Sequence, residues 1–258
     1  KMKWMQQFKV WVFGLMMLAP TLLATSLAAQ STKTQDSKPD QDPTQKEVTA
    51  QPLIVPVLMK PGKLVFSDSF KESTLRPQWT PLHQTRWNVI NGMLHGIPAT
   101  EEFQKSRTKH NGGTPSSKLE VPVTDCILQM SFKLTGKMNG AHFGFNDGTF
   151  QSGTGHVGRV TFHKRDGISL IKDKNTKLEN DQVEVLKSVP FKIQSDHWYT
   201  FVLEVKGEKL VMQLKDGPTL KARHERFRAP KSWINLPTRG GGEIFYDDVR
   251  IWAPLKEE

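Results

Sequence analysis

An alternation of apolar and polar residues with a period of two runs through almost the whole chain from Pro61 onward, and it is the strongest constraint on the fold. Successive side chains of a β-strand point to opposite faces, so this period predicts strands with one buried face. No stretch shows a sustained helical period. About a dozen short strand candidates are separated by Gly, Asn, Asp and Pro residues. The pattern predicts an all-β domain made of two packed antiparallel sheets.

The clearest hairpin runs from Trp198 to Asp216, with KGEK as its turn. Pairing about this turn places two apolar rows opposite each other: Tyr199, Phe201, Leu203 and Val205 against Leu210, Met212 and Leu214. Trp198 has the opposite parity to its apolar neighbours. We therefore expect its ring to be exposed and available for stacking on a ligand.

The N-terminal part of the chain has a different composition. Lysines precede the apolar run VWVFGLMMLAPTLLATSLAA, which ends in small residues, so residues 1–28 are predicted to be a secretory signal peptide. Residues 29–60 begin with a polar, proline-containing stretch and are predicted to be a flexible linker. The folded domain is then predicted to span residues 61–258. This organisation predicts a secreted, periplasmic or cell-surface protein with no membrane attachment after signal cleavage.

The cysteine content limits the disulfides that can form, and the net charge limits the classes of binding partner. Cys126 is the only cysteine, so no internal disulfide forms, and its place on the apolar side of DCILQMSFKL predicts a core residue. The net charge of +10 favours anionic partners. The basic stretches FQKSRTKH, FHKRDG and LKARHERFRAPK lack the interleaved aromatic residues of a nucleic-acid reader. An anionic, sulfated or uronic polysaccharide is therefore predicted in preference to nucleic acid.

Several motifs occur in a characteristic order: FSDSF, LRPQWTP, WNVINGMLHG, GHVGRVTF, ISLIKDKNTK, WYTFVLEVKGEKLVMQLKDG and IFYDDVRIW. In this order they resemble the concanavalin A-like jelly-roll domains of secreted bacterial proteins. In particular, they resemble the 3-keto-disaccharide hydrolase domain family of planctomycete-type bacteria, over about residues 61–254. The resemblance implies a jelly-roll sandwich with a carbohydrate-related role.

Two consecutive aspartates interrupt the last apolar strand candidate, EIFYDDVRIW. If Phe245, Val249 and Ile251 face the core, parity turns Asp247 inward and Asp248 outward. A buried carboxylate must be paired or hydrogen-bonded, because an unpaired buried charge is very unfavourable. Asp247 is therefore predicted to be structural and not catalytic.

In related jelly rolls the last strand lies beside the first, which places Asp247 next to the VFSDSF segment. We expect Asp247 and Asp68 to form a structural clamp there. Asp247 either accepts hydrogen bonds from backbone and serine groups or shares a structural calcium ion with Asp68. No other cofactor is expected.

Parity also outlines a candidate ligand surface on three central strands. Their outward positions are predominantly polar: Gln129, Ser131, Lys133, His142, Gly144, Asn146, Arg159, Thr161 and His163. If these strands are neighbours, the residues form one platform whose donors and acceptors suit sugar hydroxyls. Gln129, Lys133, Asn146 and Trp198 are the predicted ligand-binding residues. The alternative is an ordinary solvated sheet face.

Three functions remain open at this point. The platform lacks the carboxylate pair that most glycosidases use, which favours carbohydrate binding without turnover. An enzyme acting on 3-keto sugars by elimination is the alternative, with His142 or His163 as the base. Arg159 or Lys133 would then stabilise the oxyanion. A purely structural envelope protein is the third. The histidines lack HExxH spacing, so a zinc site would have to be assembled across strands: His110, His142, His156 and His163.

Overall fold

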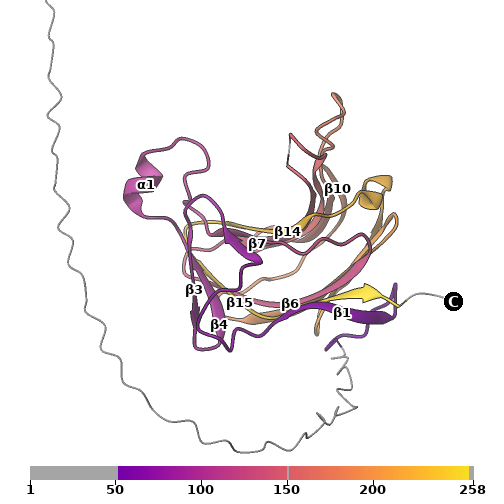
Figure 1. Ribbon diagram of the computed structural model, residues 1–258, viewed down its shortest axis with the longest axis horizontal. Helices are drawn as coiled ribbons and strands as arrows, with labels where there is room; N and C mark the ends of the chain where they lie inside the picture. The colour runs from indigo at the N-terminus through magenta and orange to yellow at the C-terminus, as the bar shows by residue number, and fades with distance from the viewer. Residues whose placement is uncertain (1–51, 150, 256–258) are drawn as a thin grey trace, which may run out of the picture. The chain divides into compact units, whose positions relative to one another are not determined.

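The computed structural model describes residues 52–149 and 151–255, so the predicted signal peptide lies outside the described residues. The described chain forms two antiparallel sheets that pack face to face (Figure 1). The eight-stranded sheet has the order β13 (Thr219–Arg223), β12 (Lys209–Leu214), β11 (Trp198–Lys206), β6 (Cys126–Thr135), β15 (Glu243–Pro254), β4 (Met93–Ile97) and β3 (Arg86–Ile90), with β1 (Pro61–Asp68) also paired to β15. The seven-stranded sheet has the order β10 (Glu184–Val189), β9 (Gly167–Lys172), β8 (Gly155–His163), β7 (Gly140–Asp147), β14 (Trp233–Arg239), β5 (Ser116–Leu119) and β2 (Trp79–Pro81).

The core lies between the two sheets and is rich in phenylalanine. Phe132 and Phe201 project from the eight-stranded sheet, and Phe143 and Phe162 project from the seven-stranded sheet; all four are fully buried. Their ring centroids lie 4.6 Å apart for Phe143 and Phe201 and 5.1 Å apart for Phe132 and Phe143. Aromatic side chains bury large apolar areas and favour tilted contacts of this kind. The predicted all-β sandwich is therefore confirmed.

The parity analysis is confirmed for the central strands. In β6, Cys126, Leu128, Met130, Phe132 and Leu134 belong to the core, as predicted. Burial raises the pKa of the Cys126 thiol to about 12, as expected for an inert core cysteine. The predicted hairpin is formed by β11 and β12 with Lys206 opposite Lys209. The first and last strands, β1 and β15, are paired as expected.

Residues 52–60, which the sequence assigned to the linker, are part of the folded unit. The buried Glu204 carboxylate of β11 accepts the backbone N–H groups of residues 57–59 at 2.7 to 3.1 Å. Met59 packs on Val202 and Trp252 in a small cluster outside the main core. The predicted domain start at residue 61 is therefore too late, because these few apolar residues cover the outer face of the eight-stranded sheet.

The two helical segments are short. They are α1 (Glu101–Lys105) and a 3-10 turn at Glu225–Arg228. Figure 1 shows α1 and β10 at opposite ends of the seven-stranded sheet, both on its outer side, with β7 and β14 between them. Within the part of the chain that the structure describes, no helix is long and apolar enough to span a bilayer.

The predicted orientation of Asp247 is wrong. Tyr246 is fully buried in the core, whereas Phe245 is only half-buried and stacks on His95 outside it, at 4.4 Å between centroids. The inward row of β15 thus begins at Ile244 and Tyr246, and Asp247 continues the outer row. A register shift between Asp247 and Arg250 then returns Val249 and Ile251 to the core. A β-bulge adds one residue and so reverses the parity, which alternation alone does not reveal.

Asp248 is the extra residue of this bulge and has a left-handed φ of 48°. Its carboxylate accepts the side-chain amide of Gln129 at 2.6 Å and pairs with Arg250 at 2.6 Å. Asp247 accepts the backbone N–H of Asp248 at 2.6 Å. Burial, followed by the nearby Asp248 and Asp68 carboxylates, raises the pKa of Asp247.

Asp68 is the buried carboxylate at the junction of β1 and β15, with 7% of its surface exposed. One oxygen accepts the backbone N–H of Phe70 at 2.9 Å, and the other accepts the indole N–H of Trp79 at 3.0 Å. The bond from Trp79 ties β1 to β2 across the two sheets, and the bond from Phe70 fixes the turn that follows β1. No cluster of three or more His, Cys, Asp or Glu side chains suited to a metal occurs among the described residues. Calcium at Asp247 and Asp68 stays a prediction.

Candidate functional site

A cavity of about 210 Å³ lies on the outer face of the seven-stranded sheet, where β7, β8 and β14 are adjacent. Gly144 of β7 forms its floor, opposite Arg159 of β8 and Asn235 of β14. A Cβ atom on Gly144 would lie 2.7 Å from the Cβ of Arg159 and 3.0 Å from the carbonyl oxygen of Gly158. The hollow exists because this central position carries no side chain.

Polar side chains surround this floor on all sides. His142 and Asn146 lie two residues before and after Gly144 on the same strand, so they share its outward face. Arg159 and Asn235 flank it on the neighbouring strands. Six polar side chains line the cavity in total: His142, Asn146, His156, Arg159, Asp173 and Asn235.

Arg159 is fixed by an ion pair with Asp173, which follows β9 and is 3% exposed. Burial lowers the pKa of Arg159 from its ordinary value, but an arginine stays charged at neutral pH. The pair therefore leaves the cavity with balanced charge. The Nε–H of the guanidinium is buried and has no hydrogen-bond partner in the described structure.

The histidines of the cavity are neutral. Burial, aided by the charges of Arg159 and Arg239, lowers the pKa of His142 to about 4. Burial and the Arg159 charge also lower the pKa of His156, whose Nδ1 lies 2.9 Å from the amide oxygen of Asn146. A neutral imidazole offers one donor and one acceptor. The cavity thus presents neutral hydrogen-bonding groups around one ion pair, in which Asp173 neutralises the charge of Arg159.

The single platform expected from the sequence is divided between the two sheets. His142, Asn146, Arg159 and His163 face outward from the seven-stranded sheet, as parity predicted. Gln129, Lys133 and Trp198 belong to β6 and β11 of the eight-stranded sheet and face outward on the opposite side of the sandwich. Parity identifies the face of a strand but not the sheet that contains it, so the sequence merged two surfaces.

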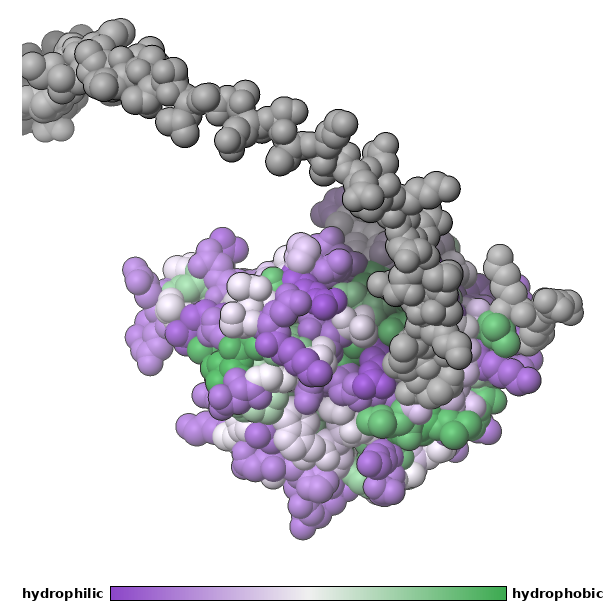
Figure 2. Space-filling model, turned by 60° about the horizontal axis from the view of Figure 1, so that its bottom comes forward, coloured by the Kyte–Doolittle hydropathy of each residue, from purple (hydrophilic) through white to green (hydrophobic). Residues whose placement is uncertain are grey.

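The residues on the eight-stranded sheet have structural contacts of their own. Gln129 is fully buried under the N-terminal segment, where its amide oxygen accepts the N–H of Leu53 at 2.5 Å. The Lys133 ammonium lies 4.6 Å from the Phe245 ring and 5.3 Å from the Trp198 ring. Trp198 is exposed, as predicted. Figure 2, which turns this underside forward, shows small apolar areas interspersed with polar ones.

His163 lies outside the cavity. It is at the end of β8, and its Nδ1 lies 2.8 Å from the Asp166 carboxylate in the following turn. His142 and His163, which were predicted as alternative bases of one site, therefore do not line a common cavity.

The predicted platform lacked three polar residues that line the cavity. His156 was considered only as a zinc ligand, and a register shift between β7 and β8 places it opposite Asn146 against the parity of Arg159. The other two are Asn235 and Asp173. Both follow the period of two: Asn235 alternates with the buried Ile234 and Leu236 of β14. Asp173 follows Ile171 on the outward side of β9. The signal was present in the sequence, but nothing in it shows that β14 lies beside β7 or that Asp173 lies next to Arg159.

No protein-family model matches the chain, and no curated protein matches it in sequence. Solved structures do match its fold. A Bacillus subtilis protein of unknown function with a galectin-like fold aligns with a TM-score of 0.57 and 10% identity, covering 78% of this chain and 100% of that chain. The CBM2 module of the evolved Dit protein of Lactobacillus casei BL23 phage J-1 aligns with a TM-score of 0.51 and 16% identity, covering 78% and 100%.

SCLam, a non-specific endo-β-1,3(4)-glucanase of family GH16, aligns with a TM-score of 0.50 and 12% identity, covering 76% of this chain and 95% of that chain. At such low identity these likenesses concern the fold alone. They show that the chain has the concanavalin A-like jelly-roll sandwich that its motif order predicts. This fold is shared by binding modules and by hydrolases, so the function must be argued from the site.

Proposed function

We propose that the protein binds carbohydrate, without turnover, at the cavity around Gly144. The observation that carries this proposal is a glycine floor surrounded by neutral hydrogen-bonding side chains and one ion pair, Arg159–Asp173. Ligand sites are concave and orient their ligands through a few convergent polar groups. The names of two fold neighbours, a CBM2 module and an endo-glucanase, agree with a carbohydrate ligand.

The chemistry of the ring of side chains suits hydroxyl groups. A sugar hydroxyl both donates and accepts a hydrogen bond, and neutral His142, Asn146 and Asn235 also provide both functions. The unpartnered Nε–H of Arg159 adds a donor. Rigid strands hold these groups, so little side-chain entropy is lost when a ligand binds.

Catalysis has less support from the same geometry. A general base works best when its pKa lies near the working pH, whereas His142 has a pKa of about 4. Arg159 is already paired with Asp173, and Lys133 lies on the other sheet. Asp173 is the one carboxylate among the described residues that line the cavity, whereas most glycosidases use two. Elimination on a 3-keto glycoside would still show itself as product formation, so product analysis accompanies each binding test.

The setting of this activity is also part of the proposal. A signal peptide over residues 1–28 would export the protein to the periplasm, the cell surface or the medium, where polysaccharides are accessible. Detection of the mature chain in the extracytoplasmic fraction, with its N-terminus near residue 29, tests this point. Retention of the uncleaved chain in the cytoplasm would contradict it.

The binding proposal is tested with a glycan array and calorimetry. We expect His142→Ala and Asn235→Ala to weaken binding of any array hit about tenfold each, since each removes hydrogen bonds to the ligand. His163→Ala and Trp198→Ala are matched controls, because one is outside the cavity on the same sheet and the other lies on the opposite sheet. Unchanged affinity in both cavity variants would refute the site.

A further inference from the structure

A second group of side chains borders the cavity on the side of β5. Trp233 of β14 is the direct cross-strand neighbour of Asn146, which lines the cavity. Lys118 of β5 is the direct neighbour of Asn235, which also lines it. Directly opposite residues on one face of a sheet have Cβ atoms about 5 Å apart. The Trp233 ring is therefore contiguous with the ring of polar groups around Gly144.

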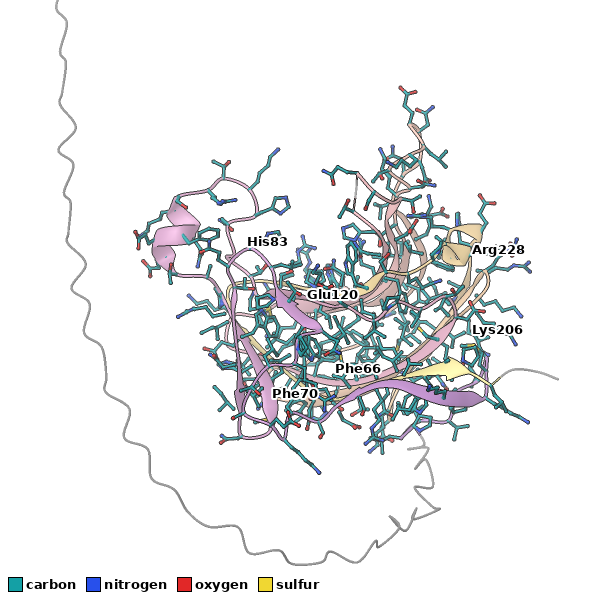
Figure 3. All side chains as sticks on the ribbon, in the orientation of Figure 1. Phe66, Phe70, His83, Glu120, Lys206 and Arg228 are labelled. Atoms are coloured by element: carbon teal, nitrogen blue, oxygen red, sulfur yellow. The ribbon has the colours of Figure 1, made fainter. Side chains whose placement is uncertain are left out.

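Charged partners stand beside this indole. The Lys118 ammonium lies 5.3 Å from the ring centroid of Trp233 and 2.8 Å from the Glu120 carboxylate. Glu120 also accepts the hydroxyl of Thr80 at 2.9 Å, and the Lys118 contact, followed by this bond, lowers the pKa of Glu120. In Figure 3, Glu120 is on the upper side of the sandwich, between His83 near α1 and Arg228 at the other end. A half-buried aromatic ring thus has a donor and an acceptor next to it on an open surface.

We infer that Trp233, Lys118 and Glu120 form a second subsite, so that the ligand is an uncharged oligosaccharide of at least two residues. This inference rests on the proposed function, because the first sugar residue occupies the cavity over Gly144. The next residue stacks its C–H face on the indole, which provides a large, rigid apolar area. Lys118 leaves the ring, stays paired with Glu120, and the two side chains bind hydroxyl groups of that residue.

The charge balance determines the ligand class. Arg159 is neutralised by Asp173, Lys118 is neutralised by Glu120, and the cavity histidines are neutral. Among the residues that line the two subsites, an anionic sugar would meet no unpaired cation, and it would be repelled by the exposed Glu120 carboxylate. Arg239 acts on His142 from outside this lining. Arg226, in the basic stretch LKARHERFRAPK, also acts on His156 from outside the cavity lining.

The test compares chain lengths on one array that carries glucose, galactose, mannose and xylose mono-, di- and tetrasaccharides beside uronic and sulfated sugars. We expect the oligosaccharides of one neutral series to bind about tenfold more tightly than its monosaccharide, with little dependence on salt. Trp233→Ala should remove that gain and leave the monosaccharide affinity unchanged. Trp233→Phe should keep most of the gain, because it keeps an aromatic face.

Glu120→Gln, which changes an exposed side chain, tests the subsite even if Trp233→Ala does not fold, and it should weaken only the oligosaccharides. Trp198→Ala is the matched tryptophan control on the other sheet. Equal affinities for monosaccharide and oligosaccharides, or an unchanged oligosaccharide affinity in Trp233→Ala, would overturn the second subsite and leave the cavity proposal intact. A salt-sensitive preference for uronic or sulfated sugars would overturn the neutral class. Absence of all binding would reject both proposals.

Discussion

Neutralising Asp247 should stabilise the protein, whereas the same substitution at its neighbour Asp248 should destabilise it. Asp247 has a raised pKa because it is partly buried near the Asp248 and Asp68 carboxylates. In Asp247→Asn, the amide oxygen still accepts the N–H of Asp248, which lies at 2.6 Å, and the repulsion disappears. Asp248→Asn keeps a residue type that tolerates a left-handed φ, but it removes the ion pair with Arg250 and weakens the bond from Gln129.

The expected magnitudes follow from these contacts. Solvent screening keeps the effect of a partly exposed charge small, so we expect Asp247→Asn to add about 0.5 kcal/mol at neutral pH. Asp248→Asn should cost about 1 to 2 kcal/mol, because hydrogen bonds to charged groups are among the stronger ones.

The pH dependence provides a second check on the sign. A carboxyl whose pKa is raised in the folded state binds its proton more tightly there than in the unfolded chain, so its ionisation destabilises the fold. The gain from Asp247→Asn should be complete at neutral pH and should vanish as the pH falls through the raised pKa, where the wild type is protonated too. Urea denaturation of the two variants at neutral and acidic pH measures this. Equal destabilisation by both substitutions would refute the assignment of the bulge.

Three further predictions concern the clamp and the cavity. Asp68→Ala should lower the free energy of unfolding by about 2 to 4 kcal/mol in urea titrations, because it leaves the N–H groups of Phe70 and Trp79 without their acceptor. A loss of less than about 0.5 kcal/mol would contradict the clamp. Because the folded-state pKa of His142 is about 4 and the unfolded value is about 6.5, the stability of the wild type relative to His142→Gln should fall as the pH drops from about 6.5 to about 4, and a flat difference would argue against burial of this imidazole. Chelation by EDTA should leave the melting temperature unchanged, because N–H donors already bind both oxygens of Asp68; a drop in melting temperature would support the calcium alternative instead.

Much of the fold follows from the period of two, and its failures have identifiable physical causes. Alternation placed Cys126 and Phe143 in the core and His142 and Arg159 outside it, because these residues lie in stretches that pair without a register shift. It failed at Asp247, where one extra residue in β15 reverses the parity. The alternation alone does not reveal such an insertion, because apolar residues face the core whether or not the strand contains the extra residue.

The candidate site was only partly predictable for a different reason. His142, Asn146 and Arg159 were identified by the outward parity of two strands that adjoin in the sheet. Lys133 was placed on the same surface as these residues, which is wrong, because the order of strands within sheets depends on long-range pairing that no short motif encodes. The cavity itself depends on Gly144 between two neighbouring strands, and this juxtaposition is visible only in the folded chain.

Mapping of bound oligosaccharide by amide chemical-shift changes in nuclear magnetic resonance tests the central claim most directly. The two faces of the sandwich carry different backbone amide groups, so their signals report on each face separately. One titration with a neutral tetrasaccharide that binds on the array therefore decides between the two faces. We predict saturable shifts centred on Gly144, His142 and Asn235 of the seven-stranded sheet, extending to the indole N–H of Trp233. Shifts centred on Lys133 and Trp198 of the eight-stranded sheet, or no saturable shifts with any tetrasaccharide of the array, would contradict the account.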